Sequence, residues 1–433
     1  MKIIVSSPIQ GPESRGHDRT GEANAEALRR IVAAQPILVD LKPAGEVIPG
    51  LAEHDLLHAG PPLAGWEEAS GALRGSILGA LVHSGLARDI TEGEVFAASG
   101  GIRLLPANDH HAGGTYAGVI ARGTPVFVVE NRADGARACA ALNEGRGKAL
   151  RYGANDTDTL ARLAWLEGEF AQILGAAIRL SGGIDLFEIL VQALHMGDDG
   201  HSRQKAASAL FMSAISPHVV ETGVGAKEAA HALRFLARND IFFLPLTMAA
   251  GKATMESAQG IPGSTVVTCM SANGVRFGIK VSGLGDRWVT AAVPSVHGRL
   301  FEGYRAQDAN PVIGDSEIAE TMGLGAFAMA GAPALARYVG GTPEEATRLA
   351  LEMYSITLAE HPRFTIPALG FRGTPTAIDV RQVVERGLAP IFNTGIAHRM
   401  PGIGQIGAGF ARTPLECYTA ALAELHRLPL PKG

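Results

Sequence analysis

A glycine-rich stretch near the end of the chain carries side chains suited to anion chemistry. Residues 393–409 read NTGIAHRMPGIGQIGAG, with His398 and Arg399 near the middle. Glycine lets backbone N–H groups approach a ligand closely, and a run of such groups can form a nest that holds an anion. Arginine suits bidentate recognition of carboxylate or phosphate, and histidine titrates near neutral pH. We expect an anion site here; the alternative is a long turn with two solvated side chains.

The apolar spacing of residues 413–426 predicts a helix directly after this stretch. Because the N-terminal end of a helix favours negative charge, this order strengthens the expectation of an anion site. The backbone of residues 402–409 is expected to form the cradle, and nearby amide side chains could bind the amide or oxo groups of a substrate. The residues assigned to these roles are Asn393, Gln405, Gly407 and Gly409.

A second candidate is the polar segment 195–205, which reads HMGDDGHSRQK. Its glycines predict a loop between helices, and the spacing of its two histidines does not fit a helical metal motif. Such loops are commonly just solvated, but this density of charge is also typical of a binding site. Its candidates are Asp198, His201 and Arg203, and the last two suit a substrate carboxylate.

Polar residues also follow two expected strands. The strand at 124–130 delivers Glu130 and Asn131 to its end, and the strand at 102–106 runs into an Asp-His-His triplet that includes His111. α/β proteins place ligand groups at strand ends. A turn cap is the alternative for Glu130. Adjacent histidines do not share one face of a helix or strand, so this triplet alone is a weak metal site.

The segment 303–321 is rich in carboxylates and amides. Capping of a following helix explains Asp315 and Ser316. It does not explain Asp308 and Asn310, so Asn310 is kept as a candidate substrate-binding residue.

Composition excludes several classes of protein. The 433 residues are 46% hydrophobic and 19% charged, with a formal net charge of −5, which allows a large core and argues against nucleic-acid or anionic-membrane binding. The three cysteines are far apart and lack CxxC spacing, so we expect neither disulfides nor a zinc ribbon but a reducing cytoplasm. No apolar run is long enough for a membrane span.

The pattern of elements predicts an α+β or α/β protein of several domains, with mixed sheets and a small helical domain inserted mid-chain. The expected boundaries are 1–155, 156–240 and 241–433. Short strands at 265–270, 274–281 and 288–293 predict a mixed or antiparallel sheet in the last region, and the run 1–7 is expected to be a strand. Glycines recur on one face of the helix expected over 70–83, at 71, 75 and 79, where tight packing explains them better than ligand contact.

Six strings, in this order, resemble the AllG (YlbE/YahG-like) family from about residue 23 to the C-terminus. They are LLHAGPP, VFVVEN, LNEGRGKALRYGA, MGDDGHSRQKAAS, DANPVIGDSEIAET and NTGIAHRMPGIGQIGAG. The resemblance implies a subunit of oxamate carbamoyltransferase, which interconverts oxalurate plus phosphate with oxamate plus carbamoyl phosphate in anaerobic allantoin breakdown. It also implies an oligomeric assembly with an FdrA-like subunit and a third companion subunit, and an α plus β fold with an inserted helical domain. No cofactor is expected.

Phosphorolysis of a ureido group passes through a tetrahedral intermediate, so a site must align two anions, stabilise an oxyanion and protonate the leaving nitrogen. On chemical grounds His398 is the candidate acid–base group and Arg399 the candidate phosphate cation. Two alternatives stay open. One is a hydrolase of ureido or cyclic amide bonds with a metal held by His110, His111, Asp198 or His201. The other is a non-catalytic scaffold for the FdrA-like partner.

Overall fold

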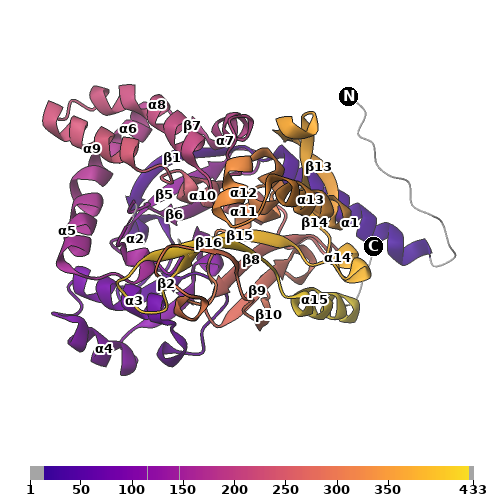
Figure 1. Cartoon of the computed structure of the whole chain (residues 1–433), viewed down its shortest axis with the longest axis horizontal. Helices are drawn as coiled ribbons and strands as arrows, with labels where there is room; N and C mark the ends of the chain where they lie inside the picture. Colours follow the sequence, from indigo (N-terminus) through magenta and orange to yellow (C-terminus); the bar gives the residue numbers. More distant parts are fainter. Residues whose placement is uncertain (1–13, 115, 146, 429–433) are drawn as a thin grey trace.

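The computed structural model describes residues 14–114, 116–145 and 147–428, and it has a mixed α/β architecture with several sheets (Figure 1). The expected fold class is therefore confirmed. The proposed domain boundaries stay a prediction, and the strand expected at 1–7 lies outside the described residues.

The N-terminal region is built on a mixed sheet of order β4-β6-β5-β1-β7. Its strands are β1 (Pro36–Pro43), β4 (Ala112–Gly113), β5 (Pro125–Asn131), β6 (Arg137–Ala141) and β7 (Ile184–Asp185). β5 pairs antiparallel with both β1 and β6, whereas β4 and β6 run parallel. A separate parallel pair joins β2 (Asp55–His58) to β3 (Arg103–Pro106). Helix α1 (Ser14–Ala33) precedes β1, and the short helix α2 (Ala44–Val47) follows it.

Helices α3 (Gly71–His83) and α4 (Ile90–Ala98) lie beside the β2–β3 pair and pack on each other. The glycine face of α3 is a packing surface, as the sequence predicted. A Cβ at Gly71 would meet the carbonyl oxygen of Arg399, and a Cβ at Gly75 would meet that of Gly153. The tip of a distant hairpin can therefore rest on α3 only where side chains are absent.

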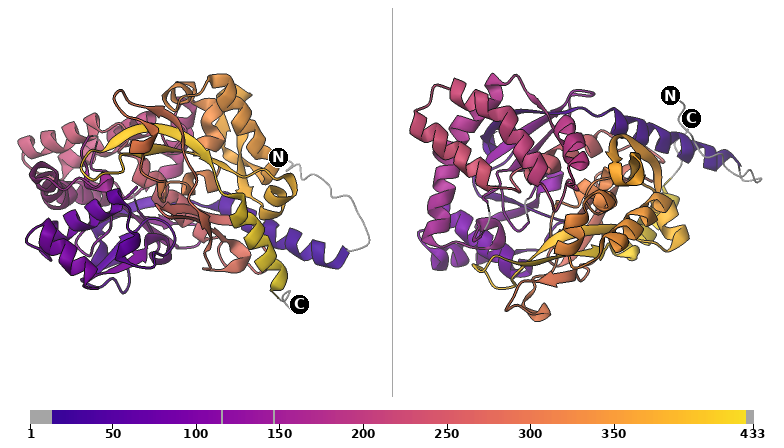
Figure 2. Two further views of the ribbon diagram at one scale, coloured as in Figure 1. Left: turned by 60° about the horizontal axis from the view of Figure 1, so that its bottom comes forward. Right: turned by 45° about the horizontal axis from the view of Figure 1, so that its top comes forward.

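The middle of the chain is mainly helical, and these helices gather at one end of the molecule (Figure 2). They are α5 (Thr157–Trp165), α6 (Ala171–Leu180), α7 (Leu186–His195), α8 (Lys205–Glu221) and α9 (Ala226–Arg238), with a π-helical turn joining α5 to α6. Buried phenylalanines, among them Phe170, Phe187 and Phe211, continue into one apolar core with Leu38 and Phe127 of the mixed sheet.

Helix α10 (Leu244–Glu256) is enclosed along nearly its whole length, with every residue from Pro245 to Met255 buried. It contacts β5 and β6 of the N-terminal sheet and also β8 and α11 of the C-terminal region. A helix that is buried all round belongs to the core of a large protein, which explains its small and apolar residues.

The C-terminal region contains an antiparallel sheet of order β10-β9-β8-β12, which confirms the three expected strands. Its strands are β8 (Val267–Asn273), β9 (Arg276–Val281), β10 (Val289–Ala292) and β12 (Ile313–Gly314). A second antiparallel pair is β13 (Thr357–Ile366) with β14 (Arg372–Ile378). The helices here are α11 (Ile318–Thr321), α12 (Pro333–Tyr338), α13 (Pro343–Met353), α14 (Val380–Arg386) and α15 (Leu415–Arg427).

The glycine-rich stretch is a β-hairpin, so residues 405–409 form a strand instead of the expected amide nest. β15 (Ile391–Ala397) and β16 (Gln405–Arg412) pair antiparallel, and β11 (His297–Leu300) adds to the other edge of β16. As the central strand, β16 points its N–H groups at two neighbouring strands rather than at a ligand. Gly407 and Gly409 leave room for β11, because a Cβ on either would meet its backbone.

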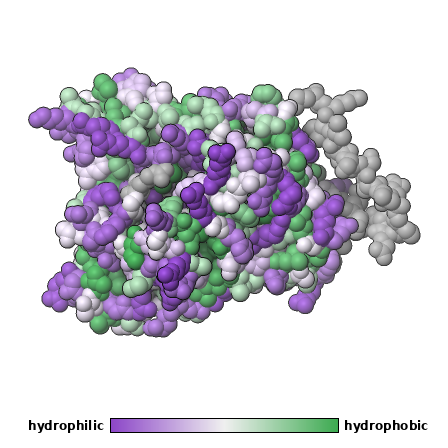
Figure 3. Space-filling model, viewed as in Figure 1, coloured by the Kyte–Doolittle hydropathy of each residue, from purple (hydrophilic) through white to green (hydrophobic). Residues whose placement is uncertain are grey.

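On the face shown in Figure 3, hydrophilic residues are interspersed with small hydrophobic patches, and exposed large apolar side chains such as Val95, Leu180 and Phe371 are scattered along the chain. Within the described residues, no helix is long and apolar enough to cross a membrane.

The close contact between α3 and the hairpin tip gives a stability prediction. Replacing Gly75 with Ala should lower the free energy of unfolding by about 1–3 kcal/mol, because the new methyl group overlaps the Gly153 carbonyl and lies 2.7 Å from Cβ of Pro401. Gly93→Ala in α4 is the matched control. Its nearest neighbour would be 3.4 Å away, so it should be neutral or stabilise by up to about 1 kcal/mol. Urea unfolding measures both; equal stabilities would contradict the packing argument.

Candidate functional site

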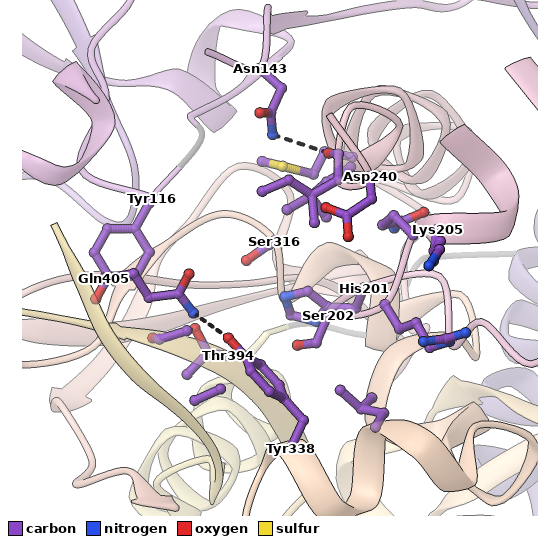
Figure 4. Close-up of a pocket in the computed structure, with 18 of the residues that line it drawn as sticks. Tyr116, Asn143, His201, Ser202, Lys205, Asp240, Ser316, Tyr338, Thr394 and Gln405 are labelled. Carbon is purple, nitrogen blue, oxygen red and sulfur yellow. Dashed lines mark hydrogen bonds between the residues drawn. The ribbon is translucent and has the colours of Figure 1, made fainter. Parts of the chain in front are cut away.

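A cavity of about 340 Å³ lies where the three regions of the chain meet. The loop before α8 forms one wall, residues after β6 form another, and the β15–β16 hairpin and the end of α12 close a third. Figure 4 shows His201, Ser202 and Ser316 near the centre of the site, Lys205 and Asp240 on one side, and Tyr116 and Gln405 on the other.

The loop before α8 is organised by the buried carboxylate of Asp199. One oxygen accepts the backbone N–H groups of His201 at 3.0 Å and Arg203 at 2.8 Å. The other accepts the side-chain amide of Asn393 from β15 at 2.7 Å. Gly200 has a left-handed backbone conformation (φ 80°), which turns the chain so that the N–H groups after it point back at Asp199. The loop is thus fixed to the hairpin rather than freely solvated.

His201 forms a buried ion pair with Glu320 of α11. Its Nδ1 lies 2.9 and 3.1 Å from the two carboxylate oxygens, and the side chains are 3% and 0% exposed. Burial alone would lower the pKa of His201, but the charge of Glu320 and its hydrogen bond outweigh this and raise the pKa to about 9. The pairing with Glu320 therefore favours the charged form of the imidazole. Among the described residues Nε2 has no hydrogen-bond partner, and His201 lines the cavity, so this N–H is free for a ligand.

A second buried carboxyl group, Glu317, lies within electrostatic range of His201. Neither of its oxygens has a hydrogen-bond partner in the described structure, and the side chain is fully buried. Burial raises its pKa to about 8, which the nearby positive His201 only partly opposes. Glu317 is consequently protonated at neutral pH.

Three of the sequence candidates line the cavity: His201, Arg203 and Gln405. Gln405 donates to the hydroxyl of Tyr338 at 3.1 Å and to the Gly407 carbonyl at 2.9 Å. Asn393 lies behind the wall, where it binds Asp199 and accepts a hydrogen bond from Ser202 at 2.6 Å. The structure thus brings these four sequence candidates together, and their roles in binding stay a prediction.

Asp198 has a structural explanation. It is fully buried and accepts the N–H of Ala207 at 2.9 Å, which satisfies the first turn of α8. Its second oxygen lies 3.4 Å from Nε of Arg203, which also donates to the Gly197 carbonyl.

His398 and Arg399 lie at the hairpin tip and do not line the cavity. His398 is buried, and its Nδ1 accepts the N–H of Met400 at 3.0 Å. Arg399 is exposed, and its backbone N–H donates to Asp308. Asn310 pairs with the backbone of Ala397 just before them. The catalytic roles assigned to His398 and Arg399 stay a prediction, and their distance from the cavity lining gives it no support.

The candidates at strand ends are also separate from the cavity. β5 is antiparallel to its neighbours, so its carboxyl end is not the shared edge that a parallel sheet would provide. Glu130 pairs with Arg137 at the surface, and Asn131 accepts the N–H of Gln35 and Ala133. His111 binds Glu256 at 2.9 Å.

Three of the four proposed metal ligands have protein partners of their own: His111 lies against Glu256, His201 against Glu320, and Asp198 accepts the N–H of Ala207. Within the described residues, no group of three or more His, Cys, Asp or Glu side chains has the arrangement of a metal site.

Sequence reasoning missed several cavity residues, notably Arg151, Tyr152 and Tyr338, and also the partner of His201, Glu320. The string LNEGRGKALRYGA marked the segment of Arg151 and Tyr152 as part of a family pattern, but nothing in it indicated that these side chains face a pocket.

Comparisons with known proteins support one family. The family model "Oxamate carbamoyltransferase subunit AllG" matches residues 102–316. The uncharacterized protein YahG of Escherichia coli (strain K12) is 43% identical over 419 residues, 97% of this chain and 87% of that protein. The oxamate carbamoyltransferase subunit AllG of the same strain is 41% identical over 407 residues, 93% of this chain and 97% of its own.

A solved structure has the same fold. The crystal structure of a conserved protein of unknown function from Enterococcus faecalis V583 matches with a TM-score of 0.93 and 42% identity, covering 95% of this chain and 98% of that one. The chain belongs to the AllG family, as its sequence motifs indicate.

The buried acid Glu317 makes stability depend on pH. A carboxyl group whose folded-state pKa lies above its unfolded value stabilises the fold at low pH, and this contribution is lost as the pH rises from about 4.5 to about 8. Glu317→Gln stays neutral, so its free energy of unfolding should rise relative to wild type by up to about 1.4 kcal/mol per pH unit in that window. Urea unfolding at pH 5.5 and 7.5 measures the difference; a constant offset between the two proteins would show that Glu317 does not titrate there.

Proposed function

We propose that this chain is a subunit of a carbamoyltransferase of the oxamate carbamoyltransferase type, with the cavity as the site for a ureido or carbamoyl substrate. The reaction would interconvert oxalurate plus phosphate with oxamate plus carbamoyl phosphate. The chain's 41% identity to the oxamate carbamoyltransferase subunit AllG over 93% of its length supports the reaction type. Its partners would be an FdrA-like subunit and a third companion subunit.

The observation that carries the proposal is the charged His201 that faces the cavity. In the forward direction a phosphate oxygen bonds to the ureido carbon, the C–N bond breaks, and the leaving nitrogen takes a proton to become the amide of oxamate. Nε2–H of His201 is the group placed to supply that proton, and Glu320 holds the ring in the orientation that presents it.

The cavity also offers neutral polar groups to the substrate. Gln405 and Tyr338 are already hydrogen bonded to each other, and Thr394 lines the same space. Such groups suit the amide and oxo atoms of a ureido compound, and their fixed positions reduce the entropy lost on binding.

The test is phosphate-dependent formation of carbamoyl phosphate from oxalurate, with this chain alone and mixed with the two companion subunits. Activity in the mixture supports the proposal, whereas folded proteins without activity in either case would mean that the substrate is different. Activity in the companion subunits without this chain would contradict a catalytic contribution from it.

The role of His201 is tested by removing both members of the ion pair. His201→Gln alone leaves Glu320 buried without a partner, which costs about 3–5 kcal/mol, so the double variant His201→Gln/Glu320→Gln is the cleaner one. We expect kcat to fall by about 10²–10⁴ while the fold is kept. His218→Gln, which alters a histidine paired with Glu221 later in α8, should keep full activity. Wild-type kcat in the double variant would rule out proton transfer by His201.

A further inference from the structure

Arg151 lies in a short 3₁₀ turn (Leu150–Tyr152), and only 4% of its surface is exposed. Its Nη1 donates to Oδ1 of Asn143 and its Nη2 to the Gly145 carbonyl, both at 2.8 Å. The guanidinium also lies over the ring of Tyr152, with 4.8 Å to the centroid. All of these partners are neutral.

No carboxylate among the described residues pairs with this buried cation. Glu144, close in sequence, uses its two oxygens for the backbone N–H groups of Leu150 at 2.6 Å and Arg151 at 2.9 Å. A buried charge is costly without a countercharge, and proteins normally supply one.

The other buried lysine and arginine side chains of the described structure obey this rule. Lys252 lies 2.9 Å from Glu256, and Lys280 lies 2.6 Å from Asp109. Arg151 differs from both in having no acidic partner and in lining the cavity. Its missing countercharge can therefore come from a ligand.

We propose that Arg151 anchors an oxyanion subsite of the cavity, where it binds a carboxylate or phosphate group of a small ligand. The planar guanidinium fork matches both groups, and Asn143 and Gly145 hold it in one orientation before the ligand arrives. The inference rests on the proposed function only in the choice of the ligands that are tested.

This assignment separates Arg151 from the other cations of the cavity. Arg203 is one-third exposed and already has Asp198 and the Gly197 carbonyl as partners. A cation that is solvated and paired gains less from an additional anion than a buried one without a countercharge. Arg151 thus takes the anchoring role that the sequence had suggested for Arg203.

Calorimetric titration of the full chain with oxamate, and separately with inorganic phosphate, tests the subsite. The wild-type chain should bind at least one of them. Arg151→Gln should weaken that binding by at least tenfold, and Arg151→Lys should recover part of it because it restores the charge but not the fork. Arg122→Gln, at a surface arginine that donates to the Leu51 carbonyl, is the matched control and should bind normally.

The two ligands identify the group that is bound. A loss confined to oxamate marks a carboxylate subsite, and a loss confined to phosphate marks a phosphate subsite. Unchanged binding of both by Arg151→Gln, or no binding of either by the wild-type chain, would overturn the proposal.

A second variant keeps the test decisive if Arg151→Gln does not fold. Gln405→Glu leaves the bonds from Arg151 to Asn143 and Gly145 in place and adds a carboxylate to the same cavity. It should weaken anion binding by about tenfold or more, and unchanged binding would count against the subsite.

The outcome for the subsite is distinguishable from that for the reaction. Binding that depends on Arg151 without any carbamoyl phosphate formation keeps the subsite and rejects the reaction. Full activity of Arg151→Gln at unchanged KM for both substrates rejects the subsite and keeps the reaction.

Discussion

The ion pair between His201 and Glu320 is the constraint on which the site depends. Two buried charges must stay in contact, because separating them leaves each one buried and unpaired. Glu320 also accepts the N–H of Ala326, and Asp199 binds both the His201 backbone and Asn393. These contacts tie the loop before α8, helix α11 and strand β15 together. The wall of the cavity is therefore set by electrostatics at the junction of the regions rather than by apolar packing alone.

Elements with a strong local pattern could be predicted from the sequence. The strand β5, the long helical stretch from α5 to α6 and the antiparallel strands β8 to β10 all follow from their apolar periodicity. The glycine face of α3 was also interpreted correctly, because small residues at helical spacing allow another segment of backbone to pack closely on a helix. The polar loop that contains His201 and Arg203 was found by its density of charge, and it does reach the cavity.

The remainder depends on partners that are distant in the chain. Glycines at residues 393–409 fit an amide nest and a crowded central strand equally well, and only the position of β11 decides between them. The burial of Arg151 depends on Asn143, Gly145 and the surrounding walls, so its sequence neighbours do not reveal an unpaired charge. Nothing next to Glu320 in the sequence indicates its ion pair, because His201 lies in another region of the chain.

The contact between α3 and the hairpin tip has a consequence for how the protein is made. The end of α3 that carries Gly71 is covered by Arg399 and Pro401, which leave the ribosome only when most of the chain has been synthesised. Contacts between segments so far apart form slowly, because a long loop must be closed first. Until then this end of α3 stays uncovered, and nascent chains that stop before the hairpin should be the species that chaperones bind.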